Sequence, residues 1–487
     1  MMTKSAHQPV VAVIAEIIMT VREFFFVVLF LFFGHTRSMT SRLIVIVGLI
    51  LLAILFGVLR WWFFTYDVTP HEITLKKGVF IRKYVHMPFE RIQTITRTQP
   101  FYFQPFDVYR VSIETSGKKD DRLVFSALRL TQIEVIEQYR QQSQTKTTES
   151  KEVPKADHVY HIQTSELVVF ALTSLGSLGI FGALATVISE LSMHMPQDLV
   201  AKFDHWFSGQ TFAGYIMILA VILIVSLVIA FARIYNRYYH FTLTRFGVHL
   251  AITQGLLTKK EIQLRLSRIQ AVHYEQSLLR RWVNLATINV LLASSGRGDK
   301  EKQDKTTIIP VVSSSKAYHV LSDFLPSYRL ITPKKAIGID HAMFYELRYE
   351  VLMSLIYLTL PTVIYFGCAY VWHWPTIYSV IGIFILSVLI IYVMICAAVR
   401  MTDQRLVIEQ ETLTLQTSQW LTKHVYTIPR DKIQGAKATQ SYFMIKSQTQ
   451  HLRVIIRNGD GAKMIDMRYL PEAEVERQTM LKVKKNN

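Results

Sequence analysis

The chain has 487 residues and a formal net charge of +18, yet 51% of its residues are hydrophobic and only 18% are charged. A mean hydropathy of +0.25 excludes an ordinary soluble protein. The two cysteines, Cys368 and Cys396, both lie in apolar runs, which excludes a disulfide framework and a cysteine-based zinc site.

Six apolar segments are candidates for helices that cross a membrane, which requires about 20 apolar residues. Four are plain: Leu43–Phe64, Leu167–Ile188, Phe212–Ala232 and Ile381–Val399. A fifth, Val351–Val371, contains Pro361, which a membrane helix tolerates as a kink. Pro9–Phe33 has an amphipathic first half, and three alternatives stay open: it lies in the interface, enters partway or spans.

These segments form three pairs, and a long basic stretch follows each pair. The resulting divisions are 1–64, 156–233 and 336–399 for the membrane helix pairs, and 65–155, 234–335 and 400–487 for the polar modules. Such regularity indicates an internal repeat.

A motif of a basic residue followed by Ile-Gln recurs in all three modules. Its copies are Arg91-Ile92-Gln93, Arg268-Ile269-Gln270 and Lys432-Ile433-Gln434. Gly78 and Gly255 each precede the basic residue by 13 positions, and an alternating strand follows each motif. Each module then ends in a predicted helix: Ser126–Gln144, Ser315–Phe324 or Pro471–Lys482. The unit is therefore two membrane helices, about six short strands and a closing helix. The fold class is an α+β membrane protein with three such repeats.

The charge distribution predicts on which side of the membrane the modules lie. The three polar stretches carry net charges of +4 (65–155), +11 (233–335) and +6 (400–487), whereas the rest of the chain is slightly acidic. An excess of Lys and Arg marks the cytoplasmic side of a membrane protein. We therefore expect all three modules to be cytoplasmic.

The second module contains Gln276-Ser-Leu-Leu-Arg280, an alternating strand to Val290, and Ala293-Ser-Ser-Gly296. Together with the basic-Ile-Gln motif, this resembles the bacterial membrane-anchored PH-like domain family, in its long three-module YdbT-type members. Asn284 stands where that family usually has glycine, and the third copy lacks the Leu-x-Arg stretch. The resemblance implies a PH-like β fold with a C-terminal helix in each module and a bacterial plasma membrane. It also implies a small single-module homologous membrane protein as partner, and a role in resistance to membrane-active peptides or bacteriocins.

Basic and aromatic residues near turns are candidates for binding lipid headgroups or a partner, because cations attract anionic lipids and Trp suits the interface. They are Lys76, Lys77, Lys259, Lys260, Arg268, Arg280, Arg281 and Trp282. The alternatives are a solvated hairpin for the lysines, a structural turn for Arg268, and simple coverage of the core for Trp282.

Three glycines in the third apolar segment, Gly176, Gly179 and Gly182, are spaced three apart along one helical strip. Such a strip allows close helix packing, and a flexible hinge is the alternative.

Catalytic motifs are missing from the sequence, which has no phosphate-binding loop, nucleophile elbow or His-Glu-x-x-His pattern. We expect no enzyme activity, no cofactor, no metal site and no nucleic-acid binding. The first hypothesis is a membrane scaffold whose modules engage anionic headgroups or partner proteins. The alternative is a transporter or lipid-handling protein gated by the modules, with Ser174, Ser177 and Thr186 as a thin polar lining.

Overall fold

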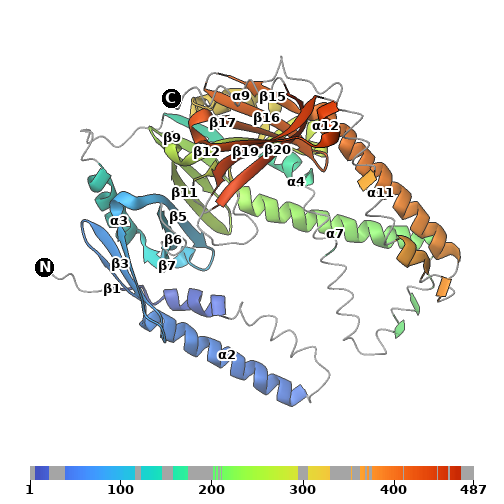
Figure 1. Cartoon of the computed structure of the whole chain (residues 1–487). Coiled ribbons are helices and arrows are strands. Elements are labelled where there is room, and N and C mark those ends of the chain that lie inside the picture. Colours follow the sequence, from blue (N-terminus) through green and yellow to red (C-terminus); the bar gives the residue numbers. More distant parts are fainter. Residues whose placement is uncertain are drawn as a thin grey trace. The chain divides into compact units, whose positions relative to one another are not determined.

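The computed structural model of the chain describes residues 6–20, 39–115, 122–144, 157–173, 182, 201–202, 205–206, 209, 211–293, 305–328, 352–353, 362–367, 370–371, 376–409, 411–446, 448–458 and 461–472. The chain divides into two compact units, Met1–Leu266 and Ser267–Asn487. Each unit combines apolar helices with antiparallel β-sheets (Figure 1). This confirms the predicted α+β class.

Three helices in the described residues are long and apolar enough to cross a membrane. They are α2 (Met39–Trp62), α7 (Phe212–Tyr238) and α11 (Thr376–Asp403) (Figure 1). Each confirms a predicted apolar segment, and a β-strand begins within four residues of its end. Because the connections are so short, each module is held close to the end of its helix.

The other predicted membrane segments are described only in part. The helix α4 (Thr164–Leu172) covers the start of Leu167–Ile188. Most of the remainder of that segment, most of Val351–Val371 and the second half of Pro9–Phe33 lie outside the described residues.

Every module contributes six strands, as the repeat predicted. The first has β2 (Thr65–Val68), β3 (Glu72–Lys77), β4 (Lys83–Pro88), β5 (Ile92–Pro100), β6 (Val108–Thr115) and β7 (Arg122–Arg129). The second has β9 (Thr242–Phe246), β10 (His249–Gln254), β11 (Thr258–Arg265), β12 (Ile269–Gln276), β13 (Leu285–Leu292) and β14 (Thr306–Ser313). The third has β15 (Arg405–Ile408), β16 (Thr412–Gln419), β17 (Thr422–Pro429), β18 (Ile433–Thr439), β19 (Thr449–Asn458) and β20 (Gly461–Pro471).

The sheets do not follow the module boundaries. In the first unit a four-stranded sheet has the order β1-β2-β3-β4, where β1 is Ala6–His7, and a seven-stranded sheet has the order β7-β6-β5-β11-β10-β9-β8, where β8 is His158–His161. In the second unit the orders are β14-β13-β12-β17-β16-β15 and β18-β19-β20. Thus β5 of the first module pairs with β11 of the second, and β12 of the second pairs with β17 of the third. Consecutive modules share continuous sheets.

The basic-Ile-Gln motif has the same backbone form in all three modules. A 3₁₀ turn, Phe89–Arg91, Leu266–Arg268 or Arg430–Lys432, ends at the basic residue, and the isoleucine starts a strand. The register of that strand shifts at the glutamine in every copy, which is the signature of a β-bulge. The recurrence of the motif is therefore explained by the fold, because the turn and the bulge start the second half of each module.

The cores lie between the sheets. In the first module, Ile73 and Leu75 of β3 face Ile113 of β6 and Phe125 of β7, and all four are fully buried. The third module has a similar core around Leu415, Val454 and Met467. Burying a side chain of this size contributes about 1.5–3 kcal/mol, so the cores hold the strands of each module together.

The closing helices agree in part with the sequence prediction. The second, α9 (Ser314–Phe324), is confirmed. The first was predicted from Ser126, but residues up to Arg129 belong to β7 and α3 runs over Leu130–Gln144. The prediction was wrong there because Leu128 and Arg129 still pair with Tyr109 and Val108 of β6, so that the strand continues to Arg129. Pro471 ends β20, and most of the third closing segment lies outside the described residues.

The start of the chain is tied to the first module. Ala6 and His7 pair with β2, and the Gln8 side chain accepts a hydrogen bond from the Ala127 amide at 3.2 Å. The helical residues 12–20 pack closely on α2, because a Cβ at Gly57 would lie 2.8 Å from Ile17. The helix in the first half of Pro9–Phe33 therefore packs against α2.

Candidate membrane-contact surface

In each module the second and third strands form a hairpin whose turn exposes apolar side chains. We call these turns the hairpin tips: Phe80–Ile81, Leu256–Leu257 and Trp420–Leu421. Phe80 is 86% exposed and Trp420 is 69% exposed. Turns in soluble proteins are usually built from Gly, Asn, Asp and Pro. Apolar pairs at three equivalent turns therefore indicate contact with something apolar.

The backbone of the tips is specified by unusual torsion angles. Gly78 and Gly255 have φ of +116° and +110°, and a Cβ on either would lie 2.0 Å from a carbonyl oxygen of the same hairpin. Only glycine fits there, which explains its fixed distance from the motif. The third tip instead places Trp420 and Leu421 at φ of +48° and +62°. Bulky residues rarely adopt this region, and such strain concentrates at functional positions.

The second hairpin tip is anchored on the end of α7. The backbone amide of Leu256 donates to the Asn236 carbonyl at 2.9 Å, and the amide of Leu257 donates to the Asn236 side chain at 2.8 Å. Asn236 lies inside the apolar span Ala213–Tyr238. These bonds hold Leu256 and Leu257 beside the C-terminal end of the apolar helix α7.

The third hairpin tip lies alongside α11. The ring of Trp420 stacks on Tyr392, with 6.3 Å between centroids and 24° between planes. Tyr392 precedes the last residue of α11 by 11 positions, which is roughly 16 Å along the axis at 1.5 Å per residue. It also lies inside the apolar span Gly382–Arg400. Trp420 therefore lies beside the apolar candidate span of α11 rather than beyond its end.

A second exposed aromatic segment follows the bulged strand of each module. It comprises Phe101–Phe106 in the first module, α8 (Leu278–Trp282) in the second and α12 (Tyr442–Lys446) in the third. Phe101, Phe106, Trp282 and Tyr442 are all exposed. In the first unit this segment adjoins the next tip, because the Gln104 amide donates to the Leu257 carbonyl at 3.3 Å. Within each unit, the hairpin tips and these aromatic segments are candidates for contact with the membrane.

Arg281 joins α8 to the end of α11. Its guanidinium forms an ion pair with the Asp403 carboxylate and donates to the Ser418 hydroxyl at 3.1 Å. Ser418 also donates to Asp403, and the Gln416 amide donates to the Asp403 carbonyl at 2.7 Å. The neighbouring Arg280 donates to the Thr287 hydroxyl at 2.9 Å. Both arginines thus have structural partners, while Trp282 is exposed beside them.

The predicted basic residues fall into two groups. Lys76 and Lys259 are exposed and Lys77 and Lys260 half-buried, all on the strands that lead to a hairpin tip. The Lys76 ammonium lies 5.6 Å from the centroid of the Tyr84 ring. Arg268, in contrast, is 4% exposed within its 3₁₀ turn. Its burial favours the structural alternative for that residue.

Some predicted positions are not described. Gly182 is described as helical, but Gly176 and Gly179 lie outside the described residues. The packing strip therefore stays a prediction. Ser174, Ser177 and Thr186, the polar lining of the transporter alternative, also lie outside the described residues.

We expect Asp403→Asn to lower the free energy of unfolding by about 2 kcal/mol, because it leaves the partly buried Arg281 without its counter-charge. Denaturant unfolding of the full chain in detergent measures the loss. The matched control is Asp466→Asn, which breaks the exposed ion pair with Arg453 and should leave stability nearly unchanged. Equal effects of the two substitutions would contradict a structural role for the Arg281 pair.

Sequence reasoning found the lysines but missed the tips themselves. Each tip is an apolar pair between two strands: Phe80-Ile81, Leu256-Leu257 and Trp420-Leu421. The signal was an apolar pair at a position where a two-strand turn normally has polar residues. In a chain with so many apolar residues, such short pairs do not stand out.

Comparison with known proteins identifies relatives of the whole repeat. The family model described as "Bacterial PH domain" matches three times, over residues 17–144, 175–323 and 352–483. The chain is 23% identical over 447 residues to the UPF0699 transmembrane protein YdbT of Bacillus subtilis (strain 168), an alignment that covers 88% of this chain and 87% of that protein. No solved structure matches significantly. Each family match begins inside a predicted apolar segment, so the matched unit includes membrane helix as well as module.

Proposed function

The chain belongs to the bacterial PH domain family, and from this premise we propose that it is a non-enzymatic membrane scaffold whose modules insert their hairpin tips into the bilayer surface and engage anionic headgroups. Three apolar helices and a transmembrane relative make it a membrane protein. The family consists of PH-domain transmembrane proteins and is not a known enzyme class. The scaffold role goes beyond membership of this family and is our proposal.

The observation that carries this proposal is the stacking of Trp420 on Tyr392, inside the apolar span of α11. A tryptophan with this exposure is stable at such a depth only if lipid covers its outer face. Leu256 and Leu257 support the same conclusion, because Asn236 holds them at the end of α7.

Charge supports the headgroup part of the proposal. Lys76 and Lys77 flank the first tip, and Lys259 and Lys260 flank the second. An apolar tip at the interface brings these ammonium groups to the headgroup level. The positive charge of the modules supports the cytoplasmic leaflet of a bacterial plasma membrane, which is rich in anionic lipid, as the contacted surface.

Depth measurement on the full chain in lipid nanodiscs tests tip insertion. A nitroxide is attached to Ile81→Cys, Leu257→Cys or Trp420→Cys, in a chain whose Cys368 and Cys396 are replaced by alanine. We expect collisions with lipid-soluble oxygen to exceed collisions with a water-soluble nickel chelate. Val159→Cys, on the exposed edge strand β8, is the matched control and should favour the chelate. Tip labels that behave like the Val159 label would refute insertion.

Lipid preference tests the headgroup part separately. Each basic residue near an anionic surface contributes about 1 kcal/mol. Lys259→Gln with Lys260→Gln should therefore weaken the preference for anionic over neutral spin-labelled lipid roughly 30-fold, with less effect at high salt. Lys316→Gln with Lys437→Gln removes the same charge from α9 and β18, outside the tips, and should change little. An equal drop in both double variants would show that only overall charge matters.

We propose that three inserted modules per chain protect the envelope, for example against membrane-active peptides or bacteriocins, and that a small single-module homologous membrane protein acts alongside it. Deletion of the gene should raise sensitivity to such peptides, and re-expression of the Lys259→Gln and Lys260→Gln chain should restore resistance only in part. Full rescue by that chain would separate resistance from headgroup binding.

A further inference from the structure

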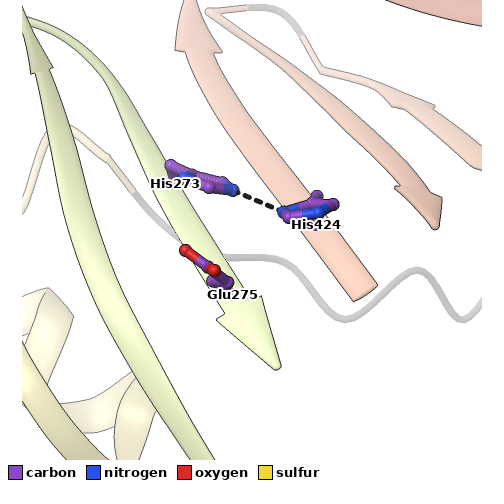
Figure 2. A group of neighbouring side chains, drawn as sticks. All are labelled: His273, Glu275 and His424. Atoms are coloured by element: carbon purple, nitrogen blue, oxygen red, sulfur yellow. Dashed lines mark hydrogen bonds between the residues drawn. The ribbon is translucent and has the colours of Figure 1, made fainter. Parts of the chain in front are cut away.

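A group of three metal-ligating side chains lies where the second and third modules share a sheet. His273 and Glu275 are on β12, and His424 is on β17. In the register of these strands Glu275 lies opposite His424, and His273 lies opposite Tyr426. Since His273 and Glu275 are two apart, all three side chains project from one face of the sheet (Figure 2).

The ligand atoms converge. His273 Nε2 and His424 Nδ1 are hydrogen-bonded at 2.9 Å, and one oxygen of Glu275 completes a group whose atoms all lie within 4.8 Å of one another (Figure 2). Two imidazole nitrogens on a tetrahedral Zn²⁺, each about 2.0–2.1 Å from the metal, lie roughly 3.3 Å apart. The histidines therefore need to separate by only about 0.4 Å to receive an ion.

The ionisation of the group suits metal binding. Burial lowers the pKa of His424 to about 4 and holds the pKa of His273 well below its usual value. Although burial opposes ionisation of Glu275, the charge of Lys305 keeps its pKa below the ordinary value. Neutral imidazoles and an ionised carboxylate are the forms in which such side chains bind metal.

Neighbouring residues fix the ligands in place. The Asn289 amide donates to Glu275 at 3.1 Å, and the Thr307 hydroxyl donates to Asn289 at 2.8 Å. The Tyr426 ring stacks on His273, 4.3 Å between centroids and 5° between planes. Such outer contacts orient metal ligands and tune their affinity.

Lys305 opposes a bound cation. Its ammonium donates to Glu275, and it adds to the positive charge of Lys463 and Arg281 near the histidines. The Lys305 side chain is 42% exposed, so it can turn outward into solvent. A metal ion would replace it on Glu275.

We propose that His273, Glu275 and His424 form a site for a divalent transition-metal ion, best matched by Zn²⁺, which joins the second module to the third. Two imidazoles and one carboxylate leave a fourth position for water. Sequence spacing did not reveal the site, because its ligands come from two modules and His424 lies 151 residues after His273.

Calorimetric titration of Zn²⁺ into the metal-stripped full chain in detergent tests this site, with Co²⁺ absorption as a probe of geometry. We expect one ion per chain, a raised unfolding temperature, and affinity on the order of 100-fold lower in His273→Gln and His424→Gln. Lys305→Gln should bind more tightly than the parent chain. His451→Gln alters another half-buried histidine of the same unit and should bind normally. Absence of binding by the parent chain, or equal affinity in His424→Gln and His451→Gln, overturns the proposal.

A separate observation concerns two strands with an open edge, β18 of the third module and β4 of the first. The strands β5, β12 and β18 each begin at the isoleucine of a basic-Ile-Gln motif. Within the described residues, β5 pairs with β11 and β12 pairs with β17 of the following module, whereas β18 is hydrogen-bonded only to β19. In the first module β4, the counterpart of β11 and β17, is hydrogen-bonded to β3 alone among the described strands. Side chains on both strands, including Tyr84, His86, Ala436 and Ala438, are exposed.

An open strand edge is a template for pairing with another chain. The pairings of β5 with β11 and of β12 with β17 show which residues would lie opposite one another in such a contact. The second residue after the bulged glutamine pairs with the fifth residue before the basic residue of the next motif: Ile95 with Gln263, and Val272 with Thr427. The same offsets match Ala436 of the third module to His86 of the first.

We infer that β18 of one copy of this chain pairs with β4 of a second copy, which continues the internal pattern from chain to chain. The contact is head-to-tail, because it joins two different strand edges rather than one self-complementary edge, and it closes into a ring of two or more copies or continues as a filament. Because every copy has the same orientation in the membrane, such an assembly stays in the plane of the bilayer.

Disulfide trapping between differently tagged chains tests this contact. In chains whose native cysteines are replaced, Ala436→Cys in one chain and His86→Cys in the other should cross-link on mild oxidation, since paired residues place their Cβ atoms about 5 Å apart. The combination of Ala436→Cys with Lys76→Cys, an exposed position on the neighbouring strand β3, is the control. Cross-linking to His86→Cys that is no greater than to Lys76→Cys overturns the inference.

Discussion

A polypeptide confined to residues 234–335, the second module alone, is expected not to fold. In the full chain β11 pairs with β5 of the first module, and β12 pairs with β17 of the third. The pairing includes the ion pair between Arg97 and Glu261, 3.4 Å apart across β5 and β11. Excision removes both partner strands and leaves two long strand edges in water, an arrangement that favours aggregation.

Circular dichroism and thermal unfolding measure the outcome. The excised module should show no cooperative transition, whereas residues 1–266 in detergent should unfold cooperatively because the seven-stranded sheet lies wholly within them. A sharp reversible transition of the 234–335 polypeptide would contradict the importance of the shared sheets.

Phe125→Ala is expected to lower the free energy of unfolding by about 4 kcal/mol, as for large side chains lost from a packed core. Phe125 is fully buried on β7. Its ring meets Tyr66 edge-on at 5.4 Å and Phe64 at 6.2 Å between centroids. Phe64 comes two residues after α2 ends, so the cavity would loosen the attachment of the first module to its membrane helix.

The matched control removes the same side chain from the surface. Phe101 is exposed in the segment that follows β5, and Phe101→Ala should leave the unfolding free energy of the chain in detergent almost unchanged. Denaturant titration of both variants provides the comparison. If the two substitutions cost the same, the aromatic group around Phe125 does not hold the module together.

Much of the fold was predictable because it is repeated and because apolar length identifies membrane helices. Leu43–Phe64, Phe212–Ala232 and Ile381–Val399 became α2, α7 and α11, and the strands after each motif appeared where alternation placed them. Strand partners were not predictable. Alternation shows which face of β11 is buried, but it does not show whether β5 or β12 lies beside it.

The candidate surface was predictable only in part. Lys259 and Lys260 were recognised because charge beside a glycine turn is conspicuous in the sequence. The position of Trp420 beside α11 was not predictable, because it depends on contact with Tyr392 of a helix that ends 17 residues earlier in the chain. Arg281 was a candidate for a binding surface, and its ion pair with Asp403 could not be predicted because the two residues lie 122 positions apart in the chain.

The shared seven-stranded sheet has a mechanical consequence. The helix α2 leads into the first module and α7 into the second, and the ladder between β5 and β11 joins those modules. If the bilayer thins, curves or is stretched, the two helices cannot drift apart unless hydrogen bonds of that ladder break together. The first unit therefore resists separation of its two modules, and deformation of the lipid around α2 and α7 places its seven-stranded β-sheet under tension.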